Sequence, residues 1–199
     1  GENPFYTDYS DGTKKYEEFI NQDLRTEIET NFRVKTDRLN RSLVGTSLGG
    51  YAALKIAMKH PELYGSVAAG SPIILLGDDP SQLIQCSSEG AVRRFGGLFR
   101  PVFGTPFDQD HWIANSVEVL ARTADLKDLK IYFSYGTADR YRSMFPLEKG
   151  LEVLDQILTE RDIPHTMRIL EGEPHGWILI KNSLGEIVEF VTQTFTTDN

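Results

Sequence analysis

The segment Gly45-Thr46-Ser47-Leu48-Gly49 matches the pattern G-x-S-x-G, which can hold a nucleophilic serine. In that pattern the serine lies on a sharp turn between a strand and a helix, so that its hydroxyl projects above a sheet. Residues 39–44 before the motif form a short strand candidate, and the small and apolar residues at 48–60 favour a buried helix that Pro61 ends. The context predicts a nucleophile elbow at Ser47. The alternative is an ordinary Gly/Ser loop.

Three glycines accompany Ser47 in this turn. In so tight a turn we expect side chains at Gly45, Gly49 and Gly50 to collide with neighbouring backbone. Glycine at these positions is therefore expected to be a steric requirement of the elbow.

A nucleophilic serine needs a histidine as its base and a carboxylate that orients the histidine. In folds with this elbow, the chain order is serine, then acid, then histidine. Asp139 follows a strand candidate at 129–135, and His175 follows another at 166–170. Both would lie at the carboxyl ends of strands, where open α/β sheets bind ligands. The order and placement predict Asp139 as the acid and His175 as the base.

The other histidines and several aspartates are weaker candidates. His60 lies at a helix end, where a cation is favourable. We expect His165 to be a surface residue before a strand, and His111 comes too early for the expected order. The rival acids are Asp108, Asp110 and Asp125, of which Asp108 and Asp110 could line a cleft or solvate a loop. The alternative role of Asp139 itself is to cap a turn.

The elements that must position these residues alternate between strand and helix. We expect helices at 16–32, 48–60, 147–161 and 184–195 and strands at 39–44, 64–69, 129–135 and 166–170. This order is typical of an α/β fold of three layers, with a mostly parallel sheet covered on both faces. Residues 71–112 are rich in Gly and Pro. They predict an irregular cap or insertion with a short helix at 81–95.

Composition narrows the possible partners. The 199 residues, 40% of them hydrophobic, suit a single domain over 1–199, and a net charge of −8 argues against a nucleic-acid partner. No run of 18 apolar residues is present, so we expect no membrane partner. Cys86 is the only cysteine, which excludes an internal disulfide and a cysteine-based zinc site. We expect no metal and no cofactor. The compartment stays open, with the cytoplasm favoured over secretion.

At these motifs the chain resembles the α/β-hydrolase family of serine esterases that includes esterase D (S-formylglutathione hydrolase), feruloyl esterases and mycolyltransferases. The resemblance runs from about Phe5 to the C-terminus. It rests on successive segments: Phe5-Tyr6-Thr7-Asp8-Tyr9, Tyr16-Glu17-Glu18-Phe19-Ile20, Gly45-Thr46-Ser47-Leu48-Gly49-Gly50, His60-Pro61-Glu62-Leu63-Tyr64-Gly65, Asp110-His111-Trp112-Ile113-Ala114-Asn115-Ser116, Tyr135-Gly136-Thr137-Ala138-Asp139 and His175-Gly176-Trp177.

The resemblance implies an α/β-hydrolase fold and acyl-ester chemistry. Carried onto the matching positions, Ser47 is the nucleophile, His175 the general base and then acid, and Asp139 its orienting partner. The backbone N–H of Leu48 would stabilise the oxyanion. Two tryptophans are candidate walls of the substrate pocket, although each could equally serve packing, and they are Trp112 and Trp177.

One departure from the family concerns the strands before the nucleophile. Only 46 residues precede Ser47, so we expect the fold to lack its N-terminal strands and the loop that donates a second oxyanion hydrogen bond. The strand from Leu39 to Val44 would then be an open edge. We expect a second copy of the chain, or the missing N-terminal segment as another chain, to pair with it.

Three functions follow from these observations. The first is a serine carboxylesterase that works through an acyl-enzyme. The second is an acyltransferase that passes the acyl group to an acceptor other than water. The third is a non-catalytic α/β-hydrolase-like module that binds a ligand or partner, which the missing N-terminal loop would favour.

Overall fold

The computed structural model of the protein describes residues 5–78, 90–142 and 147–195, with only the backbone described for 90–96. Its centre is a sheet of four parallel strands in the order β1 (Ser42–Thr46), β2 (Ser66–Gly70), β3 (Lys130–Gly136) and β4 (His165–Leu170). The register pairs Gly45 with Ala69, and Ala69 with Phe133. The predicted parallel α/β sheet is confirmed.

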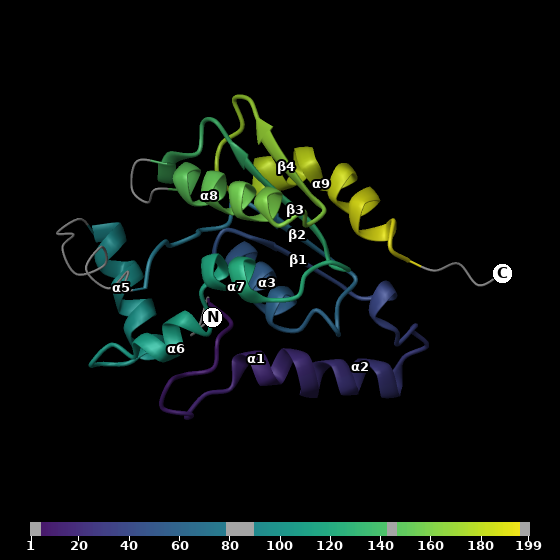
Figure 1. The fold of residues 1–199 in the computed structure, drawn as a ribbon, viewed down its shortest axis with the longest axis horizontal. Coiled ribbons are helices and arrows are strands. Elements are labelled where there is room, and N and C mark those ends of the chain that lie inside the picture. Colours follow the sequence, from purple (N-terminus) through teal and green to yellow (C-terminus); the bar gives the residue numbers. More distant parts are fainter. Residues whose placement is uncertain (1–4, 79–89, 143–146, 196–199) are drawn as a thin grey trace.

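Helices cover the two faces of this sheet unequally (Figure 1). On one face, α3 (Leu48–Lys59), α7 (Val117–Thr123) and α8 (Leu147–Glu160) enclose the main core, which takes Val67 and Phe133 from the sheet. On the other face, α9 (Trp177–Thr192) packs on β2 and β3 around Ala68 and Tyr132. Because successive residues of a strand point to opposite faces, both sides of β2 and β3 are buried.

A continuous helical segment precedes the sheet and comprises α1 (Tyr16–Glu18), a π-helical turn η1 (Phe19–Leu24) and α2 (Arg25–Asn31). Figure 1 shows it as the purple rod at the bottom of the molecule. The predicted helix at 16–32 is confirmed. A 3₁₀ turn η2 (Arg38–Asn40) follows, so β1 begins at Ser42 rather than at the predicted residue 39.

An ion network ties this helical segment to α3. The Lys55 ammonium is fully buried, pairs with the Glu17 carboxylate, and also donates to the Tyr6 carbonyl at 2.8 Å. Glu17 additionally contacts Lys59 at 2.9 Å and His60 at 3.0 Å. Burial lowers the pKa of Lys55 to about 8 against the opposing effect of Glu17. Burial alone would raise the pKa of Glu17, but the hydrogen bond from His60 and the two lysines hold it well below its usual range.

The region between β2 and α7 is more helical than the sequence predicts. It contains α5 (Gly90–Phe103) and α6 (Gln109–Ile113), which lie at the left of Figure 1. The predicted end of this helix at residue 95 is therefore wrong. The helix continues through Pro101 to Phe103, because Phe99, Val102 and Phe103 bury their side chains in the core. The first part of that prediction, at 81–89, lies outside the described residues.

The closing helix α9 also differs from its predicted extent of 184–195. It begins at Trp177, directly after Gly176, whose φ of +106° suits glycine alone among ordinary residues. Its buried residues recur every four positions, as Leu179, Ser183 and Ile187, so the sheet-facing stripe starts more than one turn before residue 184. Within the described ranges, no helix combines the length and the apolar character needed to cross a bilayer.

Candidate active site

Ser47 lies at the junction between β1 and α3 with a backbone φ of +57° and ψ of −124°. A non-glycine residue is strained in that conformation and persists there only where its surroundings fix it. Here the Ser47 N–H donates to the Gly70 carbonyl at 2.8 Å, and its carbonyl accepts the Tyr51 N–H at 3.0 Å. Ser47 therefore lies on a strained turn between a strand and a helix, and these hydrogen bonds hold it there.

The glycines of this turn are not equivalent. A Cβ at Gly45 would lie 2.0 Å from the Gly49 carbonyl oxygen, and one at Gly50 would lie 3.1 Å from Cβ of Pro72. The expectation of a collision is confirmed at Gly45, where backbone blocks the space. It is wrong at Gly49, because nothing lies within 4 Å of a Cβ there: this position faces outward on the first turn of α3.

Asp139 and His175 are in direct contact. His175 Nδ1 donates to Asp139 Oδ2 at 2.6 Å, and the two side chains expose only 9% and 0% of their surface. The second carboxylate oxygen of Asp139 accepts the Tyr141 N–H at 2.9 Å. With both oxygens engaged and water excluded, the carboxylate fixes the imidazole ring and its Nδ1–H tautomer.

The loops that carry these two residues are joined by backbone hydrogen bonds. Thr137 N–H donates to Leu170 O at 3.0 Å, and Ala138 N–H donates to Glu173 O at 3.1 Å. Gly136 makes this approach possible, since a Cβ there would lie 2.0 Å from the Glu173 carbonyl oxygen. The loops after β3 and β4 thus hold Asp139 and His175 as one unit.

Tyr141 is a residue of the candidate site that the sequence analysis missed. It lies in the 3₁₀ turn η3 (Arg140–Arg142) directly after Asp139, and its ring packs edge-to-face on His175 with 4.6 Å between centroids. The Arg140 guanidinium lies over the outer face of the Tyr141 ring at 4.9 Å. The only sequence signal for this contact is an aromatic residue two positions after Asp139. That signal does not indicate contact with His175 until the structure places the two loops side by side.

Ser47, Asp139 and His175 all lie at the carboxyl end of the parallel sheet, because they follow β1, β3 and β4 respectively. Asp139 and His175 are bonded, whereas no hydrogen bond joins Ser47 to His175 in the part of the chain that the structure describes. Leu48 opens α3, so its N–H is one of the first-turn donors that have no acceptor within the helix. A group bound above Ser47 could accept from it.

The two predicted tryptophans lie in different environments. Trp112 is fully buried, packs against Phe99 and Phe103, and donates its indole N–H to the Gly77 carbonyl at 3.0 Å. That placement favours the packing role that the sequence left open for it. Trp177 is 76% exposed at the start of α9, two residues after His175, where a ligand could reach it.

The competing histidines have other partners. His60 contacts Glu17, and His111 Nε2 lies 2.8 Å from the Asp8 carbonyl oxygen. His165 was expected at the surface, but its side chain is only 12% exposed because it stacks on Phe133 and contacts Asp155. Of the competing aspartates, Asp108 caps α6 by accepting a hydrogen bond from the His111 N–H. Asp110 and Asp125 are exposed. Within the described residues, no group of three or more His, Cys, Asp or Glu side chains could hold a metal ion.

The parallel sheet, with the turn at Ser47 and the Asp139–His175 pair at its carboxyl end, defines the class of protein as an α/β-hydrolase fold. Solved structures of the same fold include an S-formylglutathione hydrolase from Agrobacterium tumefaciens, with a TM-score of 0.74 and 22% identity over 97% of this chain and 64% of that one. A ferulic acid esterase aligns with a TM-score of 0.69 and 24% identity, over 96% of this chain and 65% of that one.

The sequence comparisons are more specific. The profile of the family described as putative esterase matches residues 3–175, and the chain belongs to that family. It is similar to S-formylglutathione hydrolase from Rattus norvegicus, with 28% identity over 182 residues that cover 90% of this chain and 55% of the rat protein. The Bacillus subtilis ferri-bacillibactin esterase BesA shares 33% identity over 63 residues, which are 32% of this chain and 21% of that protein. The chain thus spans about half the length of the rat relative.

Proposed function

We propose that the protein hydrolyses acyl esters through an acyl-enzyme formed on Ser47, with His175 as the base and Asp139 as its orienting acid. One arrangement carries the proposal. The strained Ser47 at the β1–α3 junction and the buried Asp139–His175 contact lie at the same, carboxyl end of the sheet. Membership of the esterase family supports an ester as the substrate.

The bond changes follow from the roles of the three residues. Ser47 Oγ attacks the acyl carbonyl carbon while His175 Nε2 takes the hydroxyl proton, which gives a tetrahedral oxyanion. When the ester C–O bond breaks, His175 returns that proton to the leaving alcohol. Water then attacks the acyl-enzyme with His175 as base again, so the acid is released and Ser47 Oγ regains its proton. Asp139 stays ionised and stabilises the imidazolium in both halves of the reaction.

Stabilisation of the oxyanion would begin at Leu48, whose N–H lies directly after the nucleophile at the N-terminus of α3. The helix dipole adds to this effect because its positive end lies at the same place. Removal of one such donor typically lowers turnover about 10²–10³-fold, so any second donor will strongly affect the rate.

The substrate class is proposed from the relatives. Proteins named S-formylglutathione hydrolase and ferulic acid esterase both release an acyl group, and exposed Trp177 beside His175 could line the site for such a group. The same acyl-enzyme would serve an acyltransferase if an alcohol acceptor displaced water. The partition of product between acid and new ester in the presence of an added alcohol separates these two outcomes.

A fluorophosphonate probe tests the proposal, because it phosphonylates only an activated serine. Intact-protein mass should show one adduct on the 199-residue chain, and peptide mapping should place it on Ser47. The Ser47→Ala variant should take up none, whereas Ser10→Ala, in the N-terminal loop, should label like the parent. Absence of an adduct on Ser47 in a folded protein would reject the esterase and favour the non-catalytic module.

A further inference from the structure

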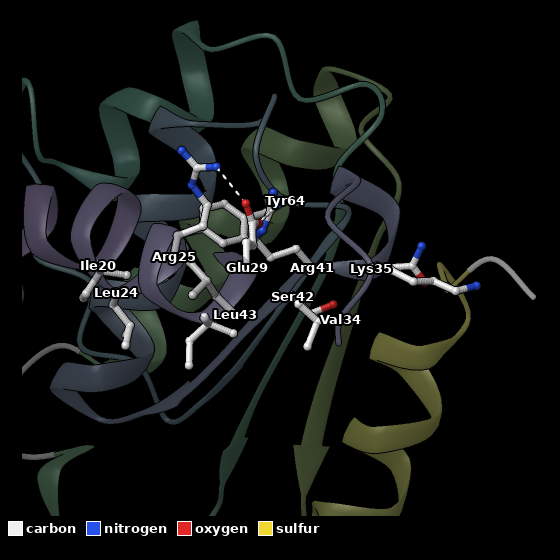
Figure 2. Close-up of a pocket in the computed structure, with 12 residues that line it drawn as sticks. Ile20, Leu24, Arg25, Glu29, Val34, Lys35, Arg41, Ser42, Leu43 and Tyr64 are labelled. Atoms are coloured by element: carbon white, nitrogen blue, oxygen red, sulfur yellow. Dashed lines mark hydrogen bonds and ion pairs between the residues drawn. The ribbon is translucent and has the colours of Figure 1, made fainter. Parts of the chain in front are cut away.

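The arginine–glutamate ion pairs of the described residues differ in what they join. Figure 2 shows the Arg25–Glu29 pair beside an apolar groove, and both of its residues belong to one helical segment. The Arg142–Glu148 pair joins two separate elements, because Arg142 lies three residues after Asp139 and Glu148 lies in the first turn of α8. This pair therefore fastens the turn that carries the candidate acid to a helix of the main core.

The Arg142 guanidinium makes contacts on two sides. Its Nε and Nη2 donate to Glu148 Oε2 at 3.2 Å and 2.5 Å. Its Nη1 donates to the Thr137 carbonyl oxygen at 2.5 Å. Because a guanidinium is planar and rigid, contacts on two sides fix the orientation of the whole group. Arg142 thus links the Thr137 carbonyl to α8.

Glu148 is held by a second partner. The hydroxyl of Tyr135, a buried residue of β3, donates to Glu148 Oε1 at 3.0 Å, so both carboxylate oxygens are engaged. The hydrogen bonds from Arg142 and Tyr135 lower the pKa of Glu148, so the carboxylate is ionised at neutral pH. Its place in the first turn of α8 also favours a negative charge. The anchor of Arg142 is therefore a fixed anion.

Thr137 is a residue through which the two site loops meet. Its N–H donates to Leu170 O at 3.0 Å, and its hydroxyl accepts the Gly172 N–H at 2.8 Å. Both partners lie at the end of β4, in the part of the chain that leads to His175. The carbonyl oxygen of Thr137 accepts from Arg142. A displacement of Thr137 would therefore move the two loops relative to each other.

The backbone of Arg142 closes the same turn. Its N–H donates to the Asp139 carbonyl at 3.2 Å, and the Asp139 N–H donates to the Gly136 carbonyl at 3.1 Å. Arg142 thus binds the carbonyl of Thr137 with its side chain and that of Asp139 with its main chain. Within this turn, Asp139 Oδ1 accepts the Tyr141 N–H at 2.9 Å. The direction of the Asp139 carboxylate therefore depends on the shape of the turn.

The exposure of the ion pair separates its effect on the site from its effect on stability. The Arg142 and Glu148 side chains expose 33% and 39% of their surface, and ion pairs this exposed contribute little to the stability of a fold. The Asp139–His175 contact carried by the turn is buried, with Asp139 Oδ2 in reach of one imidazole nitrogen. We therefore expect Arg142 to affect the geometry of the site more than the stability of the chain.

We propose that Arg142, anchored by Glu148, is a positioning residue for Asp139. It fixes the turn of residues 137–142 and so keeps the carboxylate directed at His175 Nδ1. This role rests on the proposed function, in which that contact orients the base for Ser47. Arg142 acts through the turn and not on the reacting atoms.

The rate at which a fluorophosphonate labels Ser47 measures this role. Arg142→Met keeps most of the side-chain length but removes the donors, so labelling should slow about tenfold, since a misplacement of about 1 Å can cost about 10²-fold. Arg168→Met is the matched control, because Arg168 pairs with Glu186 at 2.6 Å between β4 and α9, and it should label like the parent. Circular dichroism should show both variants folded.

A double-mutant cycle shows whether Arg142 acts through Asp139. In a chain that already carries Asp139→Asn, Arg142→Met should slow labelling by less than about twofold, because the contact that it positions is already lost. Glu148→Gln should slow labelling in the same direction as Arg142→Met, and the two changes together should be no slower than Arg142→Met alone. A purely structural role would give additive losses instead.

Amide hydrogen exchange follows the turn without any reaction at Ser47. The N–H groups of Asp139 and Tyr141 should exchange at least about tenfold faster in Arg142→Met than in the parent. In Arg168→Met they should exchange at the parent's rate. If the parent takes up no probe on Ser47, the proposed function fails, whereas this measurement still decides whether Arg142 holds the turn.

Three results would overturn the positioning role. The first is labelling of Arg142→Met at the parent's rate, or unchanged exchange at Asp139 and Tyr141. The second is equal slowing by Arg142→Met and Arg168→Met. The third is a loss from Arg142→Met that stays just as large in the chain with Asp139→Asn, since Arg142 would then act by another route.

Discussion

His175 Nδ1 lies 2.6 Å from Asp139 Oδ2, and this contact joins the loop after β4 to the loop after β3. The pair is almost fully buried, and Asp139 uses its other oxygen on the Tyr141 N–H. A carboxylate held in this way keeps the imidazole in the tautomer with an unprotonated Nε2. Only that tautomer can take a proton from a serine hydroxyl.

Asp139→Asn tests this relationship. The amide can occupy the same space but favours the wrong tautomer of His175, so we expect acylation of Ser47 by a fluorophosphonate to slow about 10⁴-fold. The control is Asp110→Asn on the exposed surface of α6, which should react like the parent. A fall of less than tenfold for Asp139→Asn would show that Asp139 does not orient the catalytic base.

The turn at Ser47 gives a second prediction, from the glycines at positions 45 and 49. Gly45→Ala would place a methyl group 2.0 Å from the Gly49 carbonyl, so the variant should lose about 3 kcal/mol of unfolding free energy. Gly49→Ala meets nothing within 4 Å in the first turn of a helix, so it should gain up to about 1 kcal/mol. Urea titrations measure both changes. Equal effects at the two positions would contradict the geometry of the turn.

The site was predictable from the sequence where its signals are local. Ser47 lies in a five-residue pattern between a strand and a helix, and Asp139 and His175 each come just after a buried strand. Tyr141 and the partners of His60 were not predictable in this way. Their roles depend on contacts between segments far apart in the chain, such as the 43 positions that separate His60 from Glu17.

The fold was predictable where apolar periodicity follows one element, as in β2, β3 and α8. The errors came where tertiary packing overrides local preference. Pro101 and two glycines favour an end to the helix, yet α5 continues because Phe99 and Phe103 reach the core. Similarly, α9 begins at Trp177 because Leu179 covers Gly70 at the end of β2, a contact that no local pattern signals.

Tyr141 gives a third prediction, as a residue that positions His175. Tyr141→Ala removes the ring that packs edge-to-face on the imidazole, a contact worth about 0.5–1.5 kcal/mol. Acylation of Ser47 should therefore slow about 2- to 10-fold. Tyr141→Phe keeps the ring and loses only the hydroxyl that accepts from Arg140, so it should restore the rate of acylation. A loss of rate with Phe as large as with Ala would assign the effect to the hydroxyl.

The last prediction concerns the ion network that joins Glu17 to α3. Glu17 has a lowered pKa in the folded protein because His60, Lys55 and Lys59 outweigh the effect of burial. Its stabilising contribution is therefore fully present above its unfolded pKa of 4.5 and is lost as pH falls below that value toward the folded one. At pH 7, Glu17→Gln leaves the Lys55 ammonium buried without its counter-charge, so it should cost about 3–5 kcal/mol of unfolding free energy.

Urea titrations of the parent and of Glu17→Gln between pH 7 and pH 3 measure this dependence. The parent should lose unfolding free energy steeply below pH 4.5. The variant should lose less, because it lacks the Glu17 carboxylate, whose protonation would weaken its pairing with Lys55. Glu18→Gln is the matched control, since Glu18 is the neighbouring residue and its partner Lys15 is largely exposed. That surface pair is expected to contribute less than about 1 kcal/mol. If the acid slope of Glu17→Gln equals that of the parent, the network does not hold the first helical segment against α3.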